Sequence, residues 1–347
     1  MSSVRNARVL FNSHPESYPI PGETIVYDTT KTIDLQSIPL NGGFLIKTLV
    51  LSVDPFLRYR MNPGVDDHMG SFRIGAPLDG FGIGVVLRSE TPEVQAGESL
   101  NNSIWTVFQE YTVYPALGEL QILKKHPKLP LSVYLGAAGM PGQTAYLGWK
   151  AYADAKPGEV AFVTTGAGAV GSIVIQLAKQ AGMKVIASAG SEEKVEFMRS
   201  LGADVAFNYK TTDTRKILEK EGPINVFWDH IGGEITDAGI EFAADGARIL
   251  SVGYISGLNS STGWPQIKKF HLVGLKSLHI HGILVTPLLE IPGYLEEFYE
   301  VMPRKLVSGE IKYVEDLTMG LDQVGEVMLA VLKGTNKGKA VVVVAEE

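Results

Sequence analysis

The stretch Glu159-Val-Ala-Phe-Val-Thr-Thr-Gly-Ala-Gly-Ala-Val-Gly171 decides the fold class of this 347-residue chain. Its first seven residues form a short apolar strand pattern that runs directly into glycines. Residues 170–182 follow as a run of good helix formers that ends in a glycine. A G-x-G-x-x-G motif between a buried strand and a helix is typical of a turn that binds a dinucleotide.

Each glycine of this motif has an expected task. Gly166 would permit the tight turn, Gly168 the close approach of a pyrophosphate to the backbone, and Gly171 the packing of the helix. The free N–H groups at the start of the helix would bind the phosphates. The alternative is a glycine-rich turn that binds no ligand.

The residues around the motif alternate between strand and helix patterns. Further strands are expected at 184–188, 205–209, 225–229, 247–252 and 279–285, with helical stretches between several of them, such as 192–201. Such alternation with short connections predicts an α/β fold with a doubly wound parallel sheet.

The two ends of the chain have a different character. About 130 N-terminal residues are rich in Gly, Pro and short β-branched runs such as 43–53 and 81–87, which indicates a mainly β unit. After residue 312, a helix at 322–332 and a strand at 340–344 are expected to complete that unit. The predicted domains are therefore 1–130 with 312–347, and 131–311.

Composition excludes several classes of protein. The chain has 31 Lys and Arg against 38 Asp and Glu, a net charge of −7, and no Cys. It therefore lacks a basic footprint for nucleic acid, a disulfide framework and a thiolate nucleophile or metal ligand. Because no apolar run approaches the length needed to span a bilayer, we expect a cytoplasmic protein with no membrane partner.

The end of the second predicted strand bears on the choice of cofactor. An NAD site normally carries an acidic residue there, but residues 187–191 read Ala-Ser-Ala-Gly-Ser. Without that carboxylate a 2′-phosphate is not repelled, and Lys194 could bind it as a point charge. We therefore predict NADP(H). Alternatively, Lys194 is an exposed lysine paired with a neighbouring Glu.

Two further groups of residues have open interpretations. His279 and His281 lie at strand spacing and point the same way, but a pair of structural histidines is the better explanation, so no metal is predicted. Tyr254 follows the strand at 247–252, where such sheets deliver residues to a ligand, and is a candidate proton donor. It could equally be a packing aromatic.

Seven motifs, taken together and in order, resemble a known family over essentially the whole chain. It is the zinc-independent branch of the medium-chain dehydrogenase/reductases, and within it the prostaglandin reductase or leukotriene hydroxydehydrogenase group of NADPH-dependent alkenal double-bond reductases. The motifs are Ser52-Val-Asp-Pro-Phe-Leu-Arg58, Gly139-Met-Pro-Gly-Gln-Thr-Ala-Tyr146, Gly166-Ala-Gly-Ala-Val-Gly171, Ala189-Gly-Ser-Glu-Glu-Lys194, Phe207-Asn-Tyr-Lys210, Asp229-His-Ile-Gly-Gly-Glu234 and Gly334-Thr-Asn-Lys-Gly-Lys339.

The resemblance implies a GroES-like catalytic domain built from both chain ends, a Rossmann domain between them, and a homodimer joined through the Rossmann sheets. It also implies roles for individual residues. Lys194 and Tyr209 would hold the 2′-phosphate, and Asn336 would lie beside the nicotinamide. The other cofactor candidates are Met140, Thr144, Gly166, Gly168, Ala169, Val170, Gly171, Gly190, His230, Gly253, Ile255, Ile283 and Leu284.

The chain departs from the family pattern at three positions. His230 stands where the family usually has Asn, so a cofactor contact could differ. Leu258 stands where the family often has a Tyr that is proposed to interact with the enolate oxygen, and Leu cannot donate a proton. Phe56 replaces a common Tyr and removes a second phenol. These changes predict a more apolar site, with a shifted substrate range.

The predicted activity is NADPH-dependent reduction of the α,β-carbon–carbon double bond of an enal or enone. Tyr254 and Asn259 are the catalytic candidates, and Phe56, Tyr59 and Leu258 are expected to line the substrate cleft between the domains. Arg58 is expected to be an ion-pair partner in the structure rather than a substrate clamp. The alternatives are an NADPH quinone oxidoreductase and an NADPH-binding protein with weakened catalysis.

Overall fold

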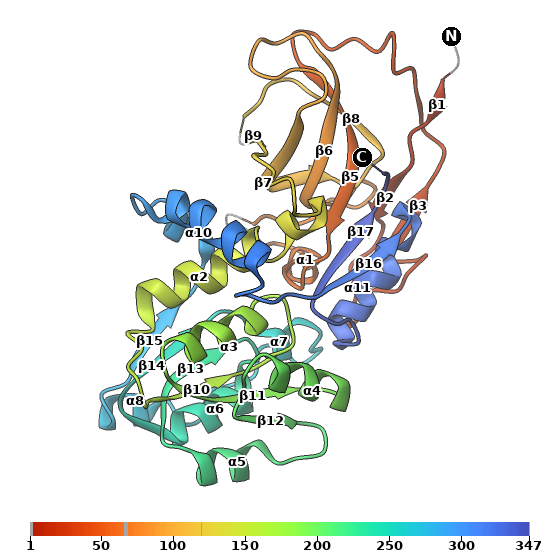
Figure 1. Ribbon diagram of the computed structural model, residues 1–347. Coiled ribbons are helices and arrows are strands. Elements are labelled where there is room, and N and C mark those ends of the chain that lie inside the picture. The colour runs from red at the N-terminus through yellow and green to blue at the C-terminus, as the bar shows by residue number, and fades with distance from the viewer. Residues whose placement is uncertain (1–2, 66–68, 119, 347) are drawn as a thin grey trace. The chain divides into compact units, whose positions relative to one another are not determined.

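The predicted parallel sheet forms within residues 136–314 of the computed structural model, which describes residues 3–65, 69–118 and 120–346 (Figure 1). Its strands run in the order β12-β11-β10-β13-β14-β15, and every neighbouring pair is parallel. The strands are β10 (Val160–Val163), β11 (Lys184–Ala189), β12 (Val205–Asn208), β13 (Ile224–Asp229), β14 (Ala243–Ser251) and β15 (His279–Gly282).

This strand order reverses direction once. The chain builds outward from β10 through β11 to β12, then crosses back so that β13 lies on the other side of β10. Ligands of doubly wound sheets bind beyond the carboxyl ends of the strands at such a reversal. The carboxyl ends of β10 and β13 therefore mark the place to look for a site.

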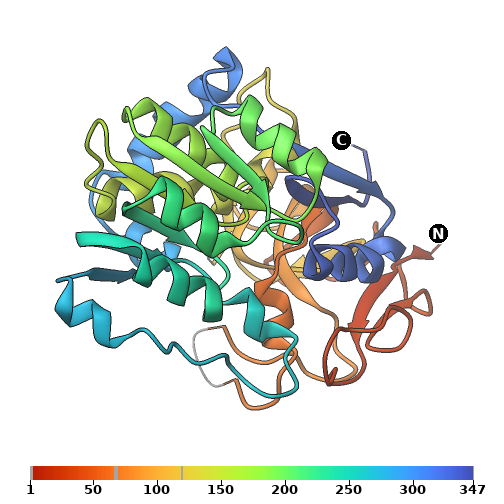
Figure 2. The same cartoon turned by 90° about the horizontal axis from the view of Figure 1, so that it is seen from below.

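Helices cover both faces of this sheet (Figure 2). Helices α3 and α4 pack on β10, β11 and β12, whereas α6 packs on β13 and β14 and contacts α5 and α8. The helices are α2 (Met140–Tyr152), α3 (Gly171–Gln180), α4 (Glu192–Ser200), α5 (Thr214–Glu221), α6 (Gly233–Glu241), α7 (Ile255–Leu258), α8 (His271–Leu275), α9 (Val285–Leu289) and α10 (Tyr294–Ser308).

Burial on both faces explains why the central strands are apolar without alternation. In β10, Ala161, Phe162 and Val163 are all fully buried. Phe162 stacks on Phe227 of β13 at 5.0 Å between ring centroids, and both belong to a core that includes Leu218 of α5 and Ile240 of α6. A run without alternating polar residues is the pattern that a parallel sheet covered by helices requires.

The remaining residues, 1–135 and 315–347, form a second compact unit. Its main sheet has the order β16-β17-β5-β6-β7-β9, with β8 also paired to β5; β16 and β17 are parallel, and the other pairs are antiparallel. Two small antiparallel pairs, β1 with β4 and β2 with β3, complete it. The strands are β1 (Val4–Arg5), β2 (Arg8–Phe11), β3 (Ile25–Asp28), β4 (Thr32–Ile33), β5 (Phe44–Ser52), β6 (Asp79–Ser89), β7 (Ser99–Val107), β8 (Tyr111–Tyr114), β9 (Leu120–Ile122), β16 (Glu315–Met319) and β17 (Lys339–Val343).

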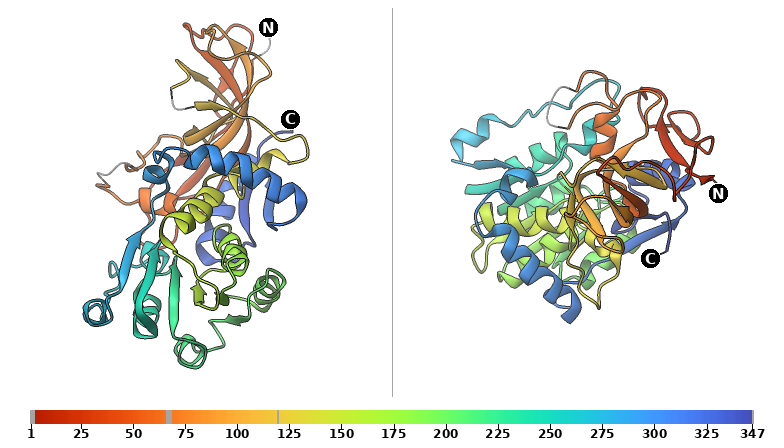
Figure 3. Two further views of the ribbon diagram at one scale, coloured as in Figure 1. Left: turned by 60° about the vertical axis from the view of Figure 1, so that its left-hand side comes forward. Right: turned by 90° about the horizontal axis from the view of Figure 1, so that it is seen from above.

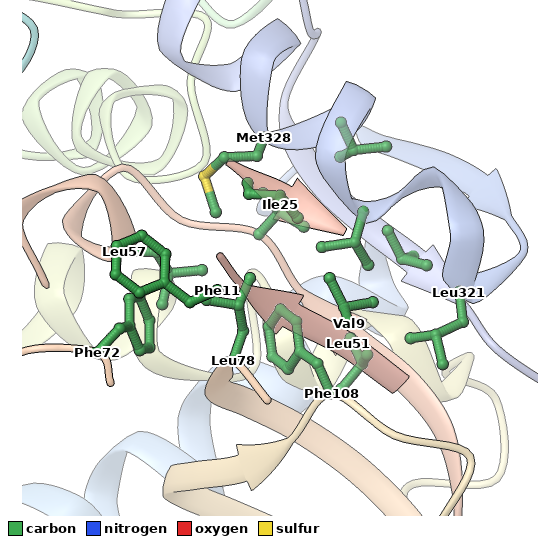
Figure 4. Close-up of a cluster of buried hydrophobic side chains, with 14 of the residues drawn as sticks. Val9, Phe11, Ile25, Leu51, Leu57, Phe72, Leu78, Phe108, Leu321 and Met328 are labelled. Carbon is green, nitrogen blue, oxygen red and sulfur yellow. The ribbon is translucent and has the colours of Figure 1, made fainter. Parts of the chain in front are cut away.

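In this unit the C-terminal strands join the N-terminal ones. β17 pairs with β5, so that Val341 lies opposite Ser52, and the blue C-terminal strands of Figure 3 run beside red and orange segments. The short helices are α1 (Phe56–Arg60), η1 (Leu131–Leu135) and η2 (Leu321–Gln323), and α11 (Val324–Lys333) is longer. The core of the unit includes Phe11, Leu51, Phe108 and Met328 of α11 (Figure 4).

The structure confirms the predicted fold class, a Rossmann doubly wound sheet together with a GroES-like, mainly β unit. One expected strand is shorter in the structure. The strand expected at 279–285 ends at Gly282, and Val285 already begins α9. No helix within the described residues is long and apolar enough to cross a membrane.

Candidate functional site

The glycine-rich turn lies at the carboxyl end of β10, at the reversal of strand order. Thr165 opens the turn in the left-handed backbone conformation, with φ of 48°, which is uncommon for a β-branched residue. The N–H of Gly166 then donates to Ser188 O of the β11 strand at 3.0 Å, and that of Gly168 donates to Thr165 O at 2.8 Å. Ala169 and Val170 complete the turn, and α3 begins at Gly171.

The three glycines have different neighbours. A Cβ on Gly166 would lie 2.6 Å from Met198 Sδ of α4 and 2.9 Å from Ile175 Cδ1 of α3, so Gly166 serves the packing of helices on the sheet. A Cβ on Gly171 would lie 2.5 Å from Thr165 O, so Gly171 serves the turn itself. Gly166 thus packs against two helices, and Gly171 brings the start of α3 close to the backbone that follows β10. At Gly168 the nearest atom is Thr165 O at 3.1 Å, which leaves this position the least crowded of the three.

The N-terminus of α3 is the candidate site for an anion, although the N–H of Ser172 already donates to Gly168 O at 3.1 Å. It has no side-chain cap and no acidic residue in its first turn. Ser191 caps α4 and Asp213 caps α5 with side-chain oxygens, whereas α2 also lacks such a cap, so it is the position of α3 at the reversal of strand order that distinguishes its N-terminus. Because the first N–H groups of a helix need acceptors and carry its positive dipole end, this arrangement fits a phosphate group.

The candidates for a 2′-phosphate lie at the ends of β11 and β12. A Cβ on Gly190 would be 3.0 Å from Tyr209 Oη and 3.2 Å from Lys210 Cε, so the phenol and this lysine lie over the glycine. Lys194 is in the first turn of α4, where its N–H donates to Ser191 Oγ. A cation and a phenol beside a glycine are donors suited to phosphate. Lys210 was missed as a candidate, although it ends the Phe207-Asn-Tyr-Lys210 motif.

The carboxylate of Glu192, the first residue of α4, is held by the protein. Asn208, the last residue of β12, donates from Nδ2 to Glu192 Oε1 at 2.9 Å. The Glu192 carboxylate therefore already accepts a hydrogen bond from a neutral side chain. The acidic residue of an NAD site instead accepts hydrogen bonds from a ribose hydroxyl.

His230 lies just beyond the carboxyl end of β13, and the protein itself engages both nitrogens of its ring. Nε2 accepts from the indole Nε1–H of Trp228 at 3.2 Å, while Nδ1 is 3.0 Å from Thr164 O and 2.8 Å from Thr165 Oγ1. Burial lowers the pKa of His230 to about 4. The imidazole is therefore neutral at physiological pH and joins the ends of β10 and β13.

Asp229, the residue before His230, holds the turn between β13 and α6. It was not among the residues predicted for the site. Its Oδ1 accepts from the N–H groups of Ile231 and Gly232, and its Oδ2 accepts from Thr236 Oγ1 at 2.5 Å. Burial raises the pKa of this carboxyl, while these hydrogen bonds act in the opposite direction. Asp229 thus shapes the start of α6 rather than facing a ligand.

Tyr254 anchors the loop that follows β14. Its hydroxyl donates to Pro265 O at 2.6 Å, and its ring lies edge-on to Trp264 at 5.8 Å between centroids. A Cβ on Gly232 would collide with the Tyr254 ring, so the ring also packs on that turn. These are the contacts of a packing aromatic, and the hydroxyl hydrogen is already donated.

The other candidates of this loop are Gly253, which precedes Tyr254, and then Ile255, Leu258 and Asn259 in α7 and at its end. Gly253 donates from its N–H to Asp229 O at 3.3 Å, and Ile255 donates to His230 O at 3.1 Å, so the loop is fixed to the end of β13. Leu258 and Asn259 come next, and both are partly buried. The loop therefore brings Tyr254, Leu258 and Asn259 to the same edge of the sheet as the glycine turn.

Four candidates lie on α2 and after β15. Met140 begins α2, and Thr144 lies one turn later, where its Oγ1 donates to Met140 O at 2.9 Å. Ile283 donates from its N–H to Ser251 O at 2.8 Å, which continues the pairing of β14 and β15 by one residue, and Leu284 follows.

In the mainly β unit, two of the motifs meet. The buried Lys339 donates to Asp54 Oδ1 at 2.8 Å and to Val53 O at 3.0 Å, which joins the motif at 334–339 to that at 52–58. Asn336 belongs to the first motif and donates from Nδ2 to Gly338 O at 3.1 Å.

The second motif continues into α1, which carries the substrate-cleft candidates of this unit. Phe56 is edge-on to Phe81 at 5.7 Å between centroids, and Tyr59 is half-buried one turn later. The buried Arg58 donates to Ser17 O, Pro15 O and Asn62 Oδ1. Arg58 thus holds the segment at residues 15–17 through carbonyl oxygens, and among the described residues it forms none of the ion pairs expected of it.

No group of three or more His, Asp or Glu side chains within the described residues is arranged to hold a metal ion. His281 instead stacks on Tyr152 at 4.7 Å between ring centroids.

Comparison with known proteins gives full-length similarity. Family models described as "N-terminal domain of oxidoreductase" and "Zinc-binding dehydrogenase" match residues 8–118 and 169–303. A 2-alkenal reductase (NADP(+)-dependent) from Nicotiana tabacum is 34% identical over 352 residues, covering 99% of each chain. Prostaglandin reductase 1 from Bos taurus is 31% identical, covering 95% of this chain and 99% of its own. The crystal structure of CurA in complex with NADPH from Vibrio vulnificus has a TM-score of 0.88 and 29% identity, covering 98% of this chain and 100% of that one.

Proposed function

Because the chain belongs to the NADPH-dependent alkenal double-bond reductases of the medium-chain dehydrogenase/reductase family, we propose that it reduces the α,β-double bond of an enal or enone. NADPH, when bound, supplies the hydride. The observation that carries the proposal is the uncapped α3 N-terminus behind a glycine turn, placed where the strand order reverses.

The chain's own residues would bind the cofactor at two places. The turn from Gly166 to Gly171 and the first N–H groups of α3 would hold the diphosphate. Lys194 and Tyr209, with Lys210 beside them, would hold the 2′-phosphate over Gly190. The donor set of a lysine and a phenol, with the Glu192 carboxylate held by Asn208, supports NADP(H) rather than NAD.

The chemistry also requires a donor for the oxygen on which negative charge develops. Leu258 cannot provide one, so we assign this task to Tyr254 or Asn259, which flank it along the loop. Tyr254 would have to exchange its hydrogen bond to Pro265 O for one to the substrate. Asn259 carries an amide N–H group that needs no change of protonation to act as a donor.

A direct assay of NADPH consumption tests the proposal. NADPH absorbance is followed with a short enal, an aryl enone and a quinone, with NADH in parallel. We expect consumption of NADPH with the enal or enone and weak turnover with NADH. In a Lys194→Ala variant, the KM for NADPH should rise roughly tenfold with little change for NADH, since about 1.4 kcal/mol of binding is lost.

The control for that variant is Lys216→Ala, which removes an exposed lysine of α5. Activity with the quinone alone would favour a quinone oxidoreductase. Saturable NADPH binding without turnover of any activated alkene would indicate that catalysis has been lost.

We further propose a cytoplasmic homodimer that pairs its sheets through β15. This strand is at the edge of the parallel sheet, and Ile280 within it and Leu284 just after it are 42% and 38% exposed. An exposed strand edge with apolar side chains is suited to pairing with a second copy. Light scattering of the wild type and of an Ile280→Lys variant tests this: the variant should be monomeric.

A further inference from the structure

His230 forms hydrogen bonds with three residues at the centre of the sheet. The backbone N–H of His230 donates to Thr164 Oγ1 at 2.8 Å. The ring Nδ1 lies 3.0 Å from Thr164 O and 2.8 Å from Thr165 Oγ1. On the other side of the ring, Trp228 Nε1–H donates to Nε2 at 3.2 Å, and Trp228 is fully buried. The ring therefore lies between Trp228 of β13 and the first two residues after β10.

These partners define the tautomer of the ring. An indole nitrogen can only donate, so Nε2 of His230 must carry the lone pair. A carbonyl oxygen can only accept, so Nδ1 must carry the hydrogen and donate to Thr164 O. The ring is consequently the neutral Nδ1–H form, with no ring nitrogen left over for a ligand.

The position of the Nδ1–H group bears on the backbone of Thr165. Thr164 O and Thr165 Oγ1 lie on the two sides of the N–Cα bond of Thr165, and both are within reach of this one N–H. Holding both atoms restricts rotation about that bond, which is the angle φ. Thr165 has a φ of 48°, a left-handed conformation that is strained for a β-branched residue.

We propose that His230 is a positioning residue for the cofactor: its ring holds Thr165 in the left-handed conformation from which the glycine turn starts, and does not itself bind the cofactor. The inference rests on the proposed function, because it assumes that the turn from Gly166 to Gly171 holds the diphosphate. It departs from the expectation that His230 contacts the cofactor directly.

The first test measures the Kd of NADP⁺ by calorimetry for the wild type, His230→Leu and His230→Asn. We expect His230→Leu to raise the Kd roughly tenfold, which corresponds to the strain released when Thr165 is no longer held. His230→Asn keeps an N–H donor and should remain within about threefold of the wild type. His271→Leu, at an exposed histidine of α8, is the matched control and should bind like the wild type.

A second variant separates positioning from a general loss of stability. Glycine adopts positive φ without strain, so Thr165→Gly should make binding independent of the ring. His230→Leu should therefore raise the Kd less than about threefold when Thr165→Gly is already present. An equal tenfold loss in both backgrounds would overturn the proposal.

The tautomer can be read in the unmodified protein, which covers the case in which His230→Leu does not fold. Nitrogen-15 spectra of histidine-labelled protein at pH 7 should show one neutral Nδ1–H ring that is absent from His230→Asn. A neutral Nε2–H ring or a charged ring at this position would contradict the proposal. Failure of the wild type to bind NADP⁺ would refute the proposed function, whereas wild-type binding with an unaltered Kd in His230→Leu would refute only the role of His230.

Discussion

The ammonium group of Lys339 lies 2.8 Å from Asp54 Oδ1, and the two residues are only 4% and 5% exposed. Ser52 Oγ donates to the other oxygen of this carboxylate, and Val53 O accepts a second hydrogen bond from the lysine. Lys339 begins β17, and Asp54 follows β5, the strand that β17 pairs with. The pair thus joins the C-terminal strand of the mainly β unit to the segment that leads into α1.

Replacing Lys339 with Met should destabilise the mainly β unit. The substitution leaves the Asp54 carboxylate buried without its counter-ion, and breaking a buried pair in this way costs about 3–5 kcal/mol. Urea unfolding of Lys339→Met, compared with Lys333→Met at the exposed end of α11, measures the loss. A loss below about 1 kcal/mol would mean that Asp54 finds another partner.

Alanine at Gly166 should mainly lower stability, whereas alanine at Gly168 should mainly weaken cofactor binding. At Gly166 the new Cβ would press on Met198 and Ile175, and such overpacking costs about 1–3 kcal/mol of stability. At Gly168 the new Cβ would meet Thr165 O at 3.1 Å and Thr165 Cβ at 4.0 Å, so the fold should persist while a pyrophosphate loses its close approach to the backbone. Thermal unfolding and NADP⁺ titration of both variants check this. Equal destabilisation by the two substitutions would contradict the assigned difference.

The sequence sufficed to predict the parallel sheet because the signals there are local. The apolar run of β10, the glycine turn and the helix formers of α3 lie within about 25 consecutive residues, and burial on both faces explains the run. The strand expected at 279–285 was too long. The N–H of Ile283 still bonds to Ser251 O, but α9 begins at Val285, although the apolar pattern continues without a break. An apolar pattern alone does not separate these states.

The candidate site could be predicted only in part, because several of its contacts join residues far apart in the chain. The bond from Trp228 to His230 and those from His230 to Thr164 and Thr165 depend on β13 lying beside β10, which no local pattern specifies. The same holds for Tyr254, whose sequence position suggested a proton donor but whose hydroxyl is donated to Pro265 O. Residue type indicates possible chemistry, and the partners decide whether that chemistry is available.

Restoring a phenol at residue 258 should increase turnover. Leu258 is partly buried in α7, in a loop whose anchor is the Tyr254 hydroxyl. A tyrosine there could donate a hydrogen bond to the developing oxyanion, and a positioned donor or acid typically contributes 10²-fold or more. We expect Leu258→Tyr to raise kcat for an enone at least roughly tenfold, with the KM for NADPH unchanged. Leu258→Phe, which adds the ring without the hydroxyl, is the control and should not raise kcat.

The stability of the protein should fall in mild acid because of His230. Its pKa is about 4 in the folded chain, against 6.5 for an unperturbed histidine, because burial disfavours the charged ring. Between these pH values the unfolded state binds a proton that the folded state does not, so stability is present above pH 6.5 and is lost as the pH falls toward 4. Between pH 7 and pH 5 this amounts to about 2 kcal/mol.

Urea unfolding of the wild type and of His230→Leu at pH 7 and pH 5 measures this contribution. The buried Asp229 carboxyl, whose pKa is raised, acts in the opposite direction but is present in both proteins, so their difference isolates the histidine. The wild type should lose more stability than the variant on going to pH 5, since leucine has no proton to bind. Equal losses would mean that the ring accepts a proton within the folded sheet, and that the bond from Trp228 to its Nε2 does not keep it neutral.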